Sequence, residues 1–223
     1  MVKRISVLDT PLRDGAQREG ISLSAHDKLR IAEKLDQLGV AYIEGGWPGS
    51  NPKDVEFFER VKEMNLRHAK VAAFGSTRRA KSAVEQDPNI LALIESGAPV
   101  AVIVGKSSRM HVTEVLNTTL SENLNMIRES VAYLKSAGRE VLYDAEHFFD
   151  GYKLDADYAI QTARVAAEAG ADCVVLCDTN GGTLPSELTQ IVAAVRQALP
   201  GMPLGIHCHD DTGVAVANTL LAV

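Results

Sequence analysis

One unit recurs along the chain: an amphipathic helical pattern ends at a glycine, and a short apolar run follows. "IAEKLDQLGVAYIEGG" shows the unit first, and "TARVAAEAGADCVVLCD" repeats it later. The apolar runs are rich in Val, Ile and Leu without strict alternation, which is typical of strands buried on both faces. Strict alternation of helix and strand predicts a parallel sheet with right-handed crossovers. The glycines stand where a helix would end in a left-handed cap, and they are Gly39, Gly97, Gly138, Gly170 and Gly201.

The spacing of these units predicts a closed fold. No composition break interrupts the pattern, so we predict one catalytic domain over residues 1–223. A spacing of roughly thirty to forty residues fits an α/β fold of the TIM (β/α)8 barrel type best, with a doubly wound open sheet as the alternative. Because the sequence stops in the helical pattern after the seventh strand, we expect strand eight and the C-terminal segments to be missing from this chain. The seven strands are predicted near residues 4–9, 41–46, 69–75, 100–105, 139–146, 172–177 and 203–209.

Composition excludes several classes of partner. The formal net charge is −6 and no basic stripe is present, which argues against nucleic acid or an anionic membrane. The start of the chain lacks the apolar core of a signal peptide, and no apolar run reaches membrane-spanning length. Cys173, Cys177 and Cys208 have neither zinc-knuckle nor Cys-x-x-Cys spacing. We therefore expect a cytoplasmic protein with reduced thiols.

Polar residues gather at the predicted carboxyl ends of five strands, which is where a barrel of this type carries its function. They stand in "LDTPLRDGAQ", at Glu44, and in "YDAEH", "CDTNGG" and "HCHDD". One buried polar group is more often a satisfied core residue, but five coincident strand ends indicate a site. The third and fourth strands end blandly by comparison, in "AFGST" and "VGKSS".

The "HCHDD" segment offers metal ligands. His207 and His209 are two positions apart, so they share one face of a strand, and Cys208 then points toward the helices as a small packed residue. Two neutral imidazoles can share one divalent metal. Asp14 in "LRDG" could supply a carboxylate to the same ion, although a plain turn with surface ion pairs is the alternative for Arg13 and Asp14.

Further polar positions have two interpretations each. Asp210 and Asp211 could orient the imidazoles, or they could cap the next helix. Thr179, together with the amides of "NGG", could hold a carboxylate, or the segment could be only a turn. Glu146 could act as an acid or base, or it could pair with a nearby Lys or Arg. Asp144 shares the face of Glu146 and is expected to help shape a substrate pocket.

Two long segments resemble the signatures of the 2-isopropylmalate, homocitrate and citramalate synthase family. They are "LRDGAQ", followed after ten residues by Lys28, and "LGIHCHDDTGVAVA". The resemblance runs from about residue 4 to the end. "IEGGWPGSNPKD" and "YDAEHFFDGYK" are most similar to the citramalate synthase branch. The wider metal-dependent group of TIM barrels includes 3-hydroxy-3-methylglutaryl-CoA lyase, 4-hydroxy-2-oxovalerate aldolase and the carboxyltransferase domain of pyruvate carboxylase.

The resemblance implies a role for individual residues. Asp14, His207 and His209 match the metal ligands of the family, and Glu146 matches its strand-five glutamate. The family also has an asparagine ligand on strand eight and a catalytic histidine further on, which this chain does not contain. The positions that match substrate-binding residues are Arg13 beside the keto oxygen, Thr179 at the carboxylate, and Gln17 and Glu44 in the same pocket.

The implied reaction is a condensation of acetyl-CoA, as co-substrate, with a 2-oxo acid. A divalent metal (Mg²⁺, Mn²⁺ or Zn²⁺) would polarise the keto carbon of pyruvate, and the acyltransferase would give (R)-citramalate and CoA on the route to isoleucine. The alternatives are 2-oxoisovalerate as acceptor, giving 2-isopropylmalate on the route to leucine, or a lyase or aldolase of the same group. A two-His, one-carboxylate iron oxygenase and an inert barrel remnant also remain. We expect small-molecule substrates, and a homodimer for the full-length protein.

Overall fold

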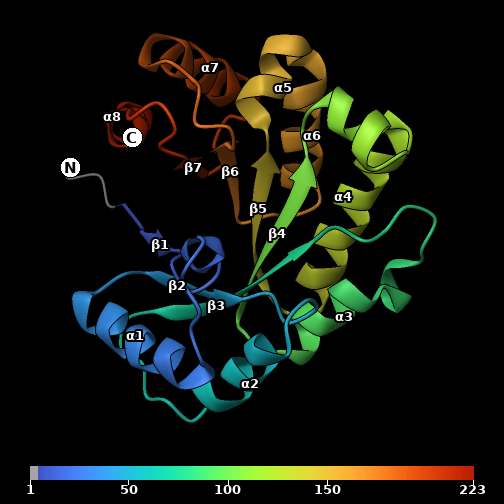
Figure 1. Cartoon of the computed structure of the whole chain (residues 1–223). Coiled ribbons are helices and arrows are strands. Elements are labelled where there is room, and N and C mark those ends of the chain that lie inside the picture. The colour runs from blue at the N-terminus through green and yellow to red at the C-terminus, as the bar shows by residue number, and fades with distance from the viewer. Residues whose placement is uncertain (1–4) are drawn as a thin grey trace.

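The structure is a computed structural model that describes residues 5–223. Its sheet has seven parallel strands in the order β1-β2-β3-β4-β5-β6-β7, curled into an incomplete barrel (Figure 1). A doubly wound sheet would place its first strand in the middle, so the sequential order confirms the barrel prediction. The strands are β1 (Leu8–Asp9), β2 (Tyr42–Gly46), β3 (Lys70–Ser76), β4 (Val100–Lys106), β5 (Glu140–Glu146), β6 (Cys173–Asp178) and β7 (Leu204–Cys208).

Helices connect the strands and cover the outside of the curl (Figure 1). The α-helices are α1 (Ala25–Leu38), α2 (Pro52–Val61), α3 (Pro88–Glu95), α4 (Leu120–Ser136), α5 (Phe148–Leu154), α6 (Ala156–Glu168), α7 (Pro185–Ala198) and α8 (Ala215–Ala222). The short turns are the 3-10 helices η1 (Gly15–Gln17) and η2 (Val84–Gln86) and the π-helical turn η3 (His111–Val115). Within residues 5–223, none of the helices combines the length and the apolar character that crossing a bilayer requires.

The predicted strand positions are confirmed for six of the seven strands, whose bounds differ from the prediction by one residue at each end or less. The first strand is much shorter than the range 4–9, of which residue 4 lies outside the described residues. Among residues 5–223 it pairs with one strand, β2, through Leu8 beside Tyr42 and Asp9 beside Ile43. Just before β1, the carbonyl of Val7 still accepts the N–H groups of Ala41 and Tyr42.

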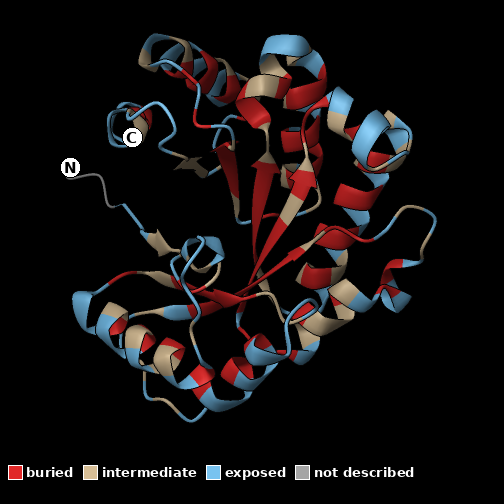
Figure 2. Cartoon of the chain, viewed as in Figure 1, coloured by how far each residue is buried: buried red, intermediate tan, exposed pale blue. Residues whose placement is uncertain are grey.

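The sheet is apolar on both faces, as the sequence pattern predicted. Alternate residues of the strands form a small cluster inside the curl, while their neighbours pack in a larger cluster with the helices. In β3, for example, Phe74 points inward and Ala73 outward. Figure 2 shows the buried strands enclosed by helices whose outer faces are exposed. The inner cluster consists of Ala72, Phe74, Val100, Val102 and Leu142, with partly buried residues packed against it.

Local capping explains where the units begin and end. Helix α1 begins at Ser24, whose side chain and that of Asp27 each accept the other residue's backbone N–H. It ends at Gly39, with φ of 89°, whose N–H donates to the carbonyls of Leu35 and Asp36. A left-handed residue at this point reverses the chain into the next strand. The predicted left-handed conformation is confirmed, since φ is positive at Gly39, Gly97, Gly138, Gly170 and Gly201. Gly201 differs in place, because it lies in a turn two residues after Leu199, the C-cap of α7.

Candidate functional site

A carboxylate and two imidazoles from opposite ends of the sequence meet at the carboxyl end of the sheet. Asp14 lies in the turn after β1, where its N–H donates to the Thr10 carbonyl. His207 lies in β7, and His209 follows that strand. The Oδ2 atom of Asp14 is 3.3 Å from Nε2 of His207 and 3.4 Å from Nε2 of His209. The structure therefore brings the three predicted ligands together, and their role as ligands stays a prediction.

The geometry of this cluster fits a shared cation. One potential ligand atom from each side chain lies within 4.8 Å of the others. Ligands bound about 2.1 Å from one metal lie roughly 3.0–3.4 Å apart, which matches the two measured separations. A carboxylate with two imidazoles is also a donor set that divalent metals accept. The cluster is thus a candidate metal site by both spacing and chemistry.

The ionisation state of Asp14 suits a role as an oxygen ligand to a cation. The hydrogen bond from His207 is the main cause that lowers the pKa of Asp14 to about 2, and the Arg13 guanidinium lowers it further. The same hydrogen bond raises the pKa of His207, against the effect of burial. Asp14 is therefore ionised at neutral pH, with its negative charge directed at the two imidazoles.

A second group of possible ligands shares His207. It adds Asp144 of β5 and Cys177 of β6, again within 4.8 Å of one another. Burial raises the pKa of the Cys177 thiol well above its usual value. Because the thiolate is the form that binds metal, this group is the weaker candidate. Burial also raises the pKa of Asp144, to about 6.

Arg13 connects the cluster to the sheet. Its Nη1 donates to Oδ1 of Asp14 at 3.1 Å, and its Nε donates to Oε1 of Glu44 at 2.5 Å. Its guanidinium carbon lies 3.7 Å from the ring centroid of Phe74, which is a close cation–π contact. Three separate contacts therefore fix the plane of the Arg13 side chain.

Glu44 lies behind Arg13 and is completely buried. It does not line the cavity described below, so the structure places this predicted pocket residue one layer further from any ligand. Burial raises its pKa to about 7, although the nearby Arg13 charge acts in the opposite direction.

A cavity of about 670 Å³ lies in front of the cluster. Cavities of about 300–1,000 Å³ are typical of small-molecule sites. It is lined on the β1 and β7 side by the Asp14, His207 and His209 cluster, and it extends across the ends of β3 and β4. The predicted site residues that line it are Arg13, Asp14, Gln17, Asp144, Glu146, Thr179, His207 and His209.

Two of these residues have partners that define their roles. Glu146 forms an ion pair with Lys106 at the end of β4, so the alternative interpretation of this glutamate, an ion pair, is present in the structure. Thr179 accepts a hydrogen bond at Oγ1 from the N–H of His147 at 2.9 Å. His147 has a φ of 53°, in the left-handed region. Because the Thr179 oxygen accepts this hydrogen bond, the hydroxyl proton remains available for donation to another group.

The residues around the histidines take the structural roles that the sequence left open. Asp210 accepts the N–H of Ala215 at 2.9 Å and so caps the start of α8. Cys208 packs against the cluster between sheet and helices, as predicted. Cys173, Cys177 and Cys208 are free.

The ends of β3 and β4, where the sequence showed no gathering of polar residues, also line the cavity. The segment after β3 lines the cavity with Thr77, Arg78 and Arg79, and β4 contributes Lys106. The apolar wall was missed as well, because nothing in a short apolar strand separates an inward aromatic such as Phe74 from an outward one. The available signal was the pair of arginines directly after "FGST".

Comparisons with known proteins agree with the fold and with the family resemblance of the sequence. The chain is 55% identical over 223 residues to a protein named (R)-citramalate synthase from Aquifex aeolicus (strain VF5), which covers 100% of this chain and 42% of that protein. It is 33% identical over 220 residues to a homocitrate synthase from Saccharolobus solfataricus, covering 99% of this chain and 46% of that protein. The chain thus spans less than half of each of these relatives.

A solved structure and a family comparison extend the agreement. The HMG-CoA lyase of Bacillus subtilis has the same fold, with a TM-score of 0.80 at 20% identity over 99% of this chain and 74% of that chain. The family described as HMGL-like matches residues 4–223. Because this match covers nearly the whole sequence, the chain belongs to the HMGL-like family.

Proposed function

We propose that this chain is the catalytic barrel of an (R)-citramalate synthase, an acyltransferase that condenses acetyl-CoA with pyruvate. The observation that carries the proposal is the convergence of Asp14, His207 and His209 beside Arg13 at one end of the cavity. The 55% identity to a protein named (R)-citramalate synthase supports the same reaction. The proposal concerns a protein longer than this chain, since the relatives are more than twice as long.

Asp14, His207 and His209 would hold a divalent cation such as Mg²⁺, Mn²⁺ or Zn²⁺. When bound, such an ion acts as a Lewis acid that polarises the keto group of the 2-oxo acid. The chain contributes the ionised carboxylate and the two imidazoles, all directed toward the cavity.

Arg13 is placed to stabilise the negative charge that develops on the keto oxygen. Its Nε and Nη1 are engaged by Glu44 and Asp14, while its Nη2 has no hydrogen-bond partner among residues 5–223. A fixed donor aimed at a developing alkoxide stabilises the transition state more than the ground state. The two engaged nitrogens therefore position the third.

Thr179 and Glu146 would act on the two substrates. The free hydroxyl proton of Thr179 can donate to the carboxylate of the oxo acid. Glu146 can take a proton from the methyl group of acetyl-CoA, with Lys106 stabilising its charge. The methyl carbon then bonds to the keto carbon, the alkoxide takes up a proton, and water cleaves the thioester to release CoA. Gln17 and the buried Asp144 would shape the pocket around the acceptor.

A thiol-release assay on the longer protein, with a divalent metal and either acceptor, tests the proposal. Pyruvate should react faster than 2-oxoisovalerate, and the product should be (R)-citramalate. A faster rate with the branched acid would identify a 2-isopropylmalate synthase instead. Cleavage of a hydroxy acid without condensation would identify a lyase or aldolase.

We also propose a homodimeric, cytoplasmic protein. The mass of the longer protein in solution and its distribution between cell fractions test these two statements.

A further inference from the structure

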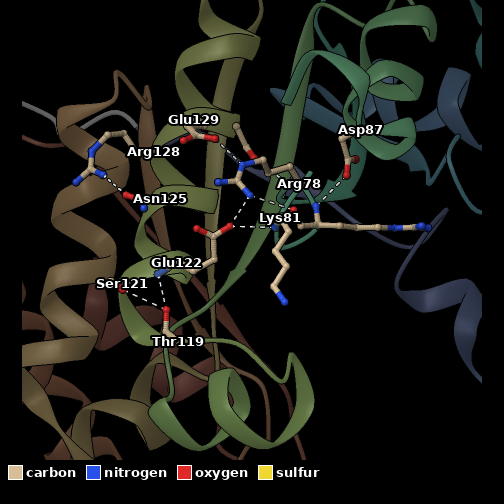
Figure 3. Close-up of polar contacts among 11 residues, drawn as sticks. Arg78, Lys81, Asp87, Thr119, Ser121, Glu122, Asn125, Arg128 and Glu129 are labelled. Carbon is tan, nitrogen blue, oxygen red and sulfur yellow. Dashed lines mark hydrogen bonds and ion pairs between the residues drawn. The ribbon is translucent and has the colours of Figure 1, made fainter. Parts of the chain in front are cut away.

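The far side of the cavity is formed by the segment between β3 and η2, and this segment is firmly held. Arg78, only 4% exposed, donates from Nε to Glu129 at 2.6 Å and from Nη1 to Glu122 at 2.8 Å, both on α4. Its backbone N–H donates to Ser130 at 2.9 Å. Figure 3 shows Arg78 enclosed by these acidic side chains. The segment is thus anchored to α4 through one buried guanidinium.

Asp87, the cap of α3, anchors the same segment from its other side. Its Oδ2 accepts the N–H of Arg79 at 2.8 Å, and the N–H of Lys81 donates to Glu122 at 3.2 Å. Lys81 has a φ of 65°, which is uncommon for a residue with a side chain. In Figure 3 the side chain of Lys81 extends away from Glu122. The backbone of both basic residues is therefore fixed while their side chains are directed elsewhere.

The charges of the two basic side chains are not compensated. Arg79 and Lys81 are exposed, and neither side chain forms a hydrogen bond or ion pair with any residue in 5–223. The other basic residues that line the cavity are paired with acids: Arg13 with Glu44, Arg78 with Glu122, and Lys106 with Glu146. Arg79 thus brings an unneutralised cation to the cavity wall.

The cavity is larger than the acceptor requires. A volume of about 670 Å³ is that of a drug-sized ligand site, whereas pyruvate is a three-carbon acid. The wall that extends from the candidate metal cluster toward Arg79 includes apolar side chains, among them Val104, Leu116 and Met126. Such a wall suits a flexible, weakly polar arm, and the cation suits an anionic group at its end.

We propose that Arg79, assisted by Lys81, binds the phosphate groups of the coenzyme A part of the acyl donor, while the apolar wall contacts its thioester arm. The identity of the donor as a CoA ester rests on the proposed function. Guanidinium groups bind phosphates through two parallel hydrogen bonds, and a preformed backbone reduces the entropic cost of that contact. The buried Arg78 network would serve to hold this phosphate subsite in place.

Calorimetric titration with free CoA tests the inference. Arg79→Ala should weaken CoA binding about 10- to 100-fold, the effect of a lost charge-assisted contact. The CoA affinity of Arg79→Lys should lie between those of the unaltered protein and of Arg79→Ala, because lysine keeps the charge and loses the planar, forked set of donors. Lys81→Gln should weaken binding by about two- to fivefold. The matched control is Arg164→Ala on the exposed face of α6, which should change CoA affinity less than about twofold.

A second measurement separates a phosphate contact from a general loss of structure. Mn²⁺ affinity and the KM for the oxo acid should stay within about twofold in Arg79→Ala, since these depend on the opposite side of the cavity. The inference is overturned if Arg79→Ala weakens CoA binding no more than Arg164→Ala, if it weakens Mn²⁺ binding equally, or if the unaltered protein does not bind CoA.

The two proposals can fail separately. If CoA binds in an Arg79-dependent way but no thiol is released with pyruvate or 2-oxoisovalerate, the proposed condensation is wrong and the phosphate subsite stands. If thiol is released at the same KM for acetyl-CoA with and without Arg79, the condensation stands and the phosphate subsite is wrong.

Discussion

The fully buried carboxylate of Glu44 accepts a hydrogen bond from Nε of Arg13 at 2.5 Å, while the same Arg13 donates from Nη1 to Asp14. Glu44 thereby acts on the site through Arg13, which lines the cavity, and does not itself line it. Glu44 is thus best described as a positioning residue, which leads to a specific pattern of kinetic effects.

Glu44→Gln keeps the shape of the side chain and weakens the hydrogen bond that it accepts from Arg13. In the longer protein kcat should fall about 10- to 100-fold, the equivalent of one charge-assisted hydrogen bond, while KM for the oxo acid changes less than about threefold. Steady-state kinetics measure both values. Glu56→Gln, which removes an exposed pair with Arg60 on α2, is the control and should leave both unchanged. A rise in KM alone would show that Glu44 affects ground-state binding.

Arg13→Lys should lower kcat much more than it raises KM for the oxo acid. Lysine keeps the positive charge, but it cannot contact Glu44, Asp14 and a substrate oxygen in one plane. The loss should exceed about 100-fold if the contact strengthens as the alkoxide forms. A change confined to KM would assign Arg13 to binding of the ground state.

Asp14→Asn and His207→Asn should each weaken Mn²⁺ or Zn²⁺ binding by at least about 100-fold, because each removes one of three ligands from the cluster. Titration calorimetry on the unaltered and altered proteins measures this. His26→Asn, an exposed histidine on α1, is the matched control. A chelator should abolish turnover in the longer protein, and added metal should restore it. Unchanged affinity in both variants would exclude this cluster as the metal site.

Gly151→Ala should destabilise the fold by about 1–3 kcal/mol through overpacking. A Cβ atom at Gly151 in α5 would lie 2.5 Å from the carbonyl oxygen of Ser107, a backbone atom that cannot turn aside. Gly182→Ala is the control, since a Cβ there meets nothing within 4 Å. Urea unfolding measures the difference. Equal stabilities would mean that α5 can move away from the segment after β4 without cost.

Asp36→Asn should reduce stability at neutral pH by about 1–3 kcal/mol. The hydrogen bond from the N–H of Arg67 is the main cause that lowers the Asp36 pKa below 3.8, and those from Ala69 and His68 add to it. A lowered folded-state pKa stabilises the fold above the unfolded-state value, and this contribution is lost as the pH falls through the folded-state value.

The difference between Asp36→Asn and the unaltered protein should therefore be largest above about pH 5 and should shrink toward pH 3. Thermal unfolding over that range measures it. Glu33→Gln, an exposed position on the same helix, should show no such trend. A difference that does not depend on pH would mean that the negative charge of Asp36 is not what stabilises the fold.

The repeated helix–strand unit could be predicted from the sequence because the features that define it are local. A glycine cap such as Gly138 and the apolar run that follows it act over a few residues, so the bounds of six strands could be predicted. The grouping of Asp14 with His207 was also accessible, because the carboxyl ends of parallel strands share one side of a barrel.

The features that the sequence did not predict depend on how deeply a side chain is buried and on partners that are far apart in the sequence. Whether Glu44 contacts a ligand or supports Arg13 is a matter of one layer of side chains, which spacing does not encode. The ion pairs of Arg78 join the segment after β3 to α4, more than forty positions along the chain. A sequence shows two adjacent arginines there, but only packing determines that Arg78 is buried and that Arg79 is not.

The sequential strand order also bears on how the site forms. In the part of the chain that the structure describes, each strand pairs with strands adjacent in the sequence and with no others. The sheet can therefore grow one helix–strand unit at a time from short-range contacts. Asp14 and His207 belong to the first and last of these units. Affinity for a cation at this cluster can therefore arise only after every intermediate unit has docked, and a partly folded chain would hold no reactive ion.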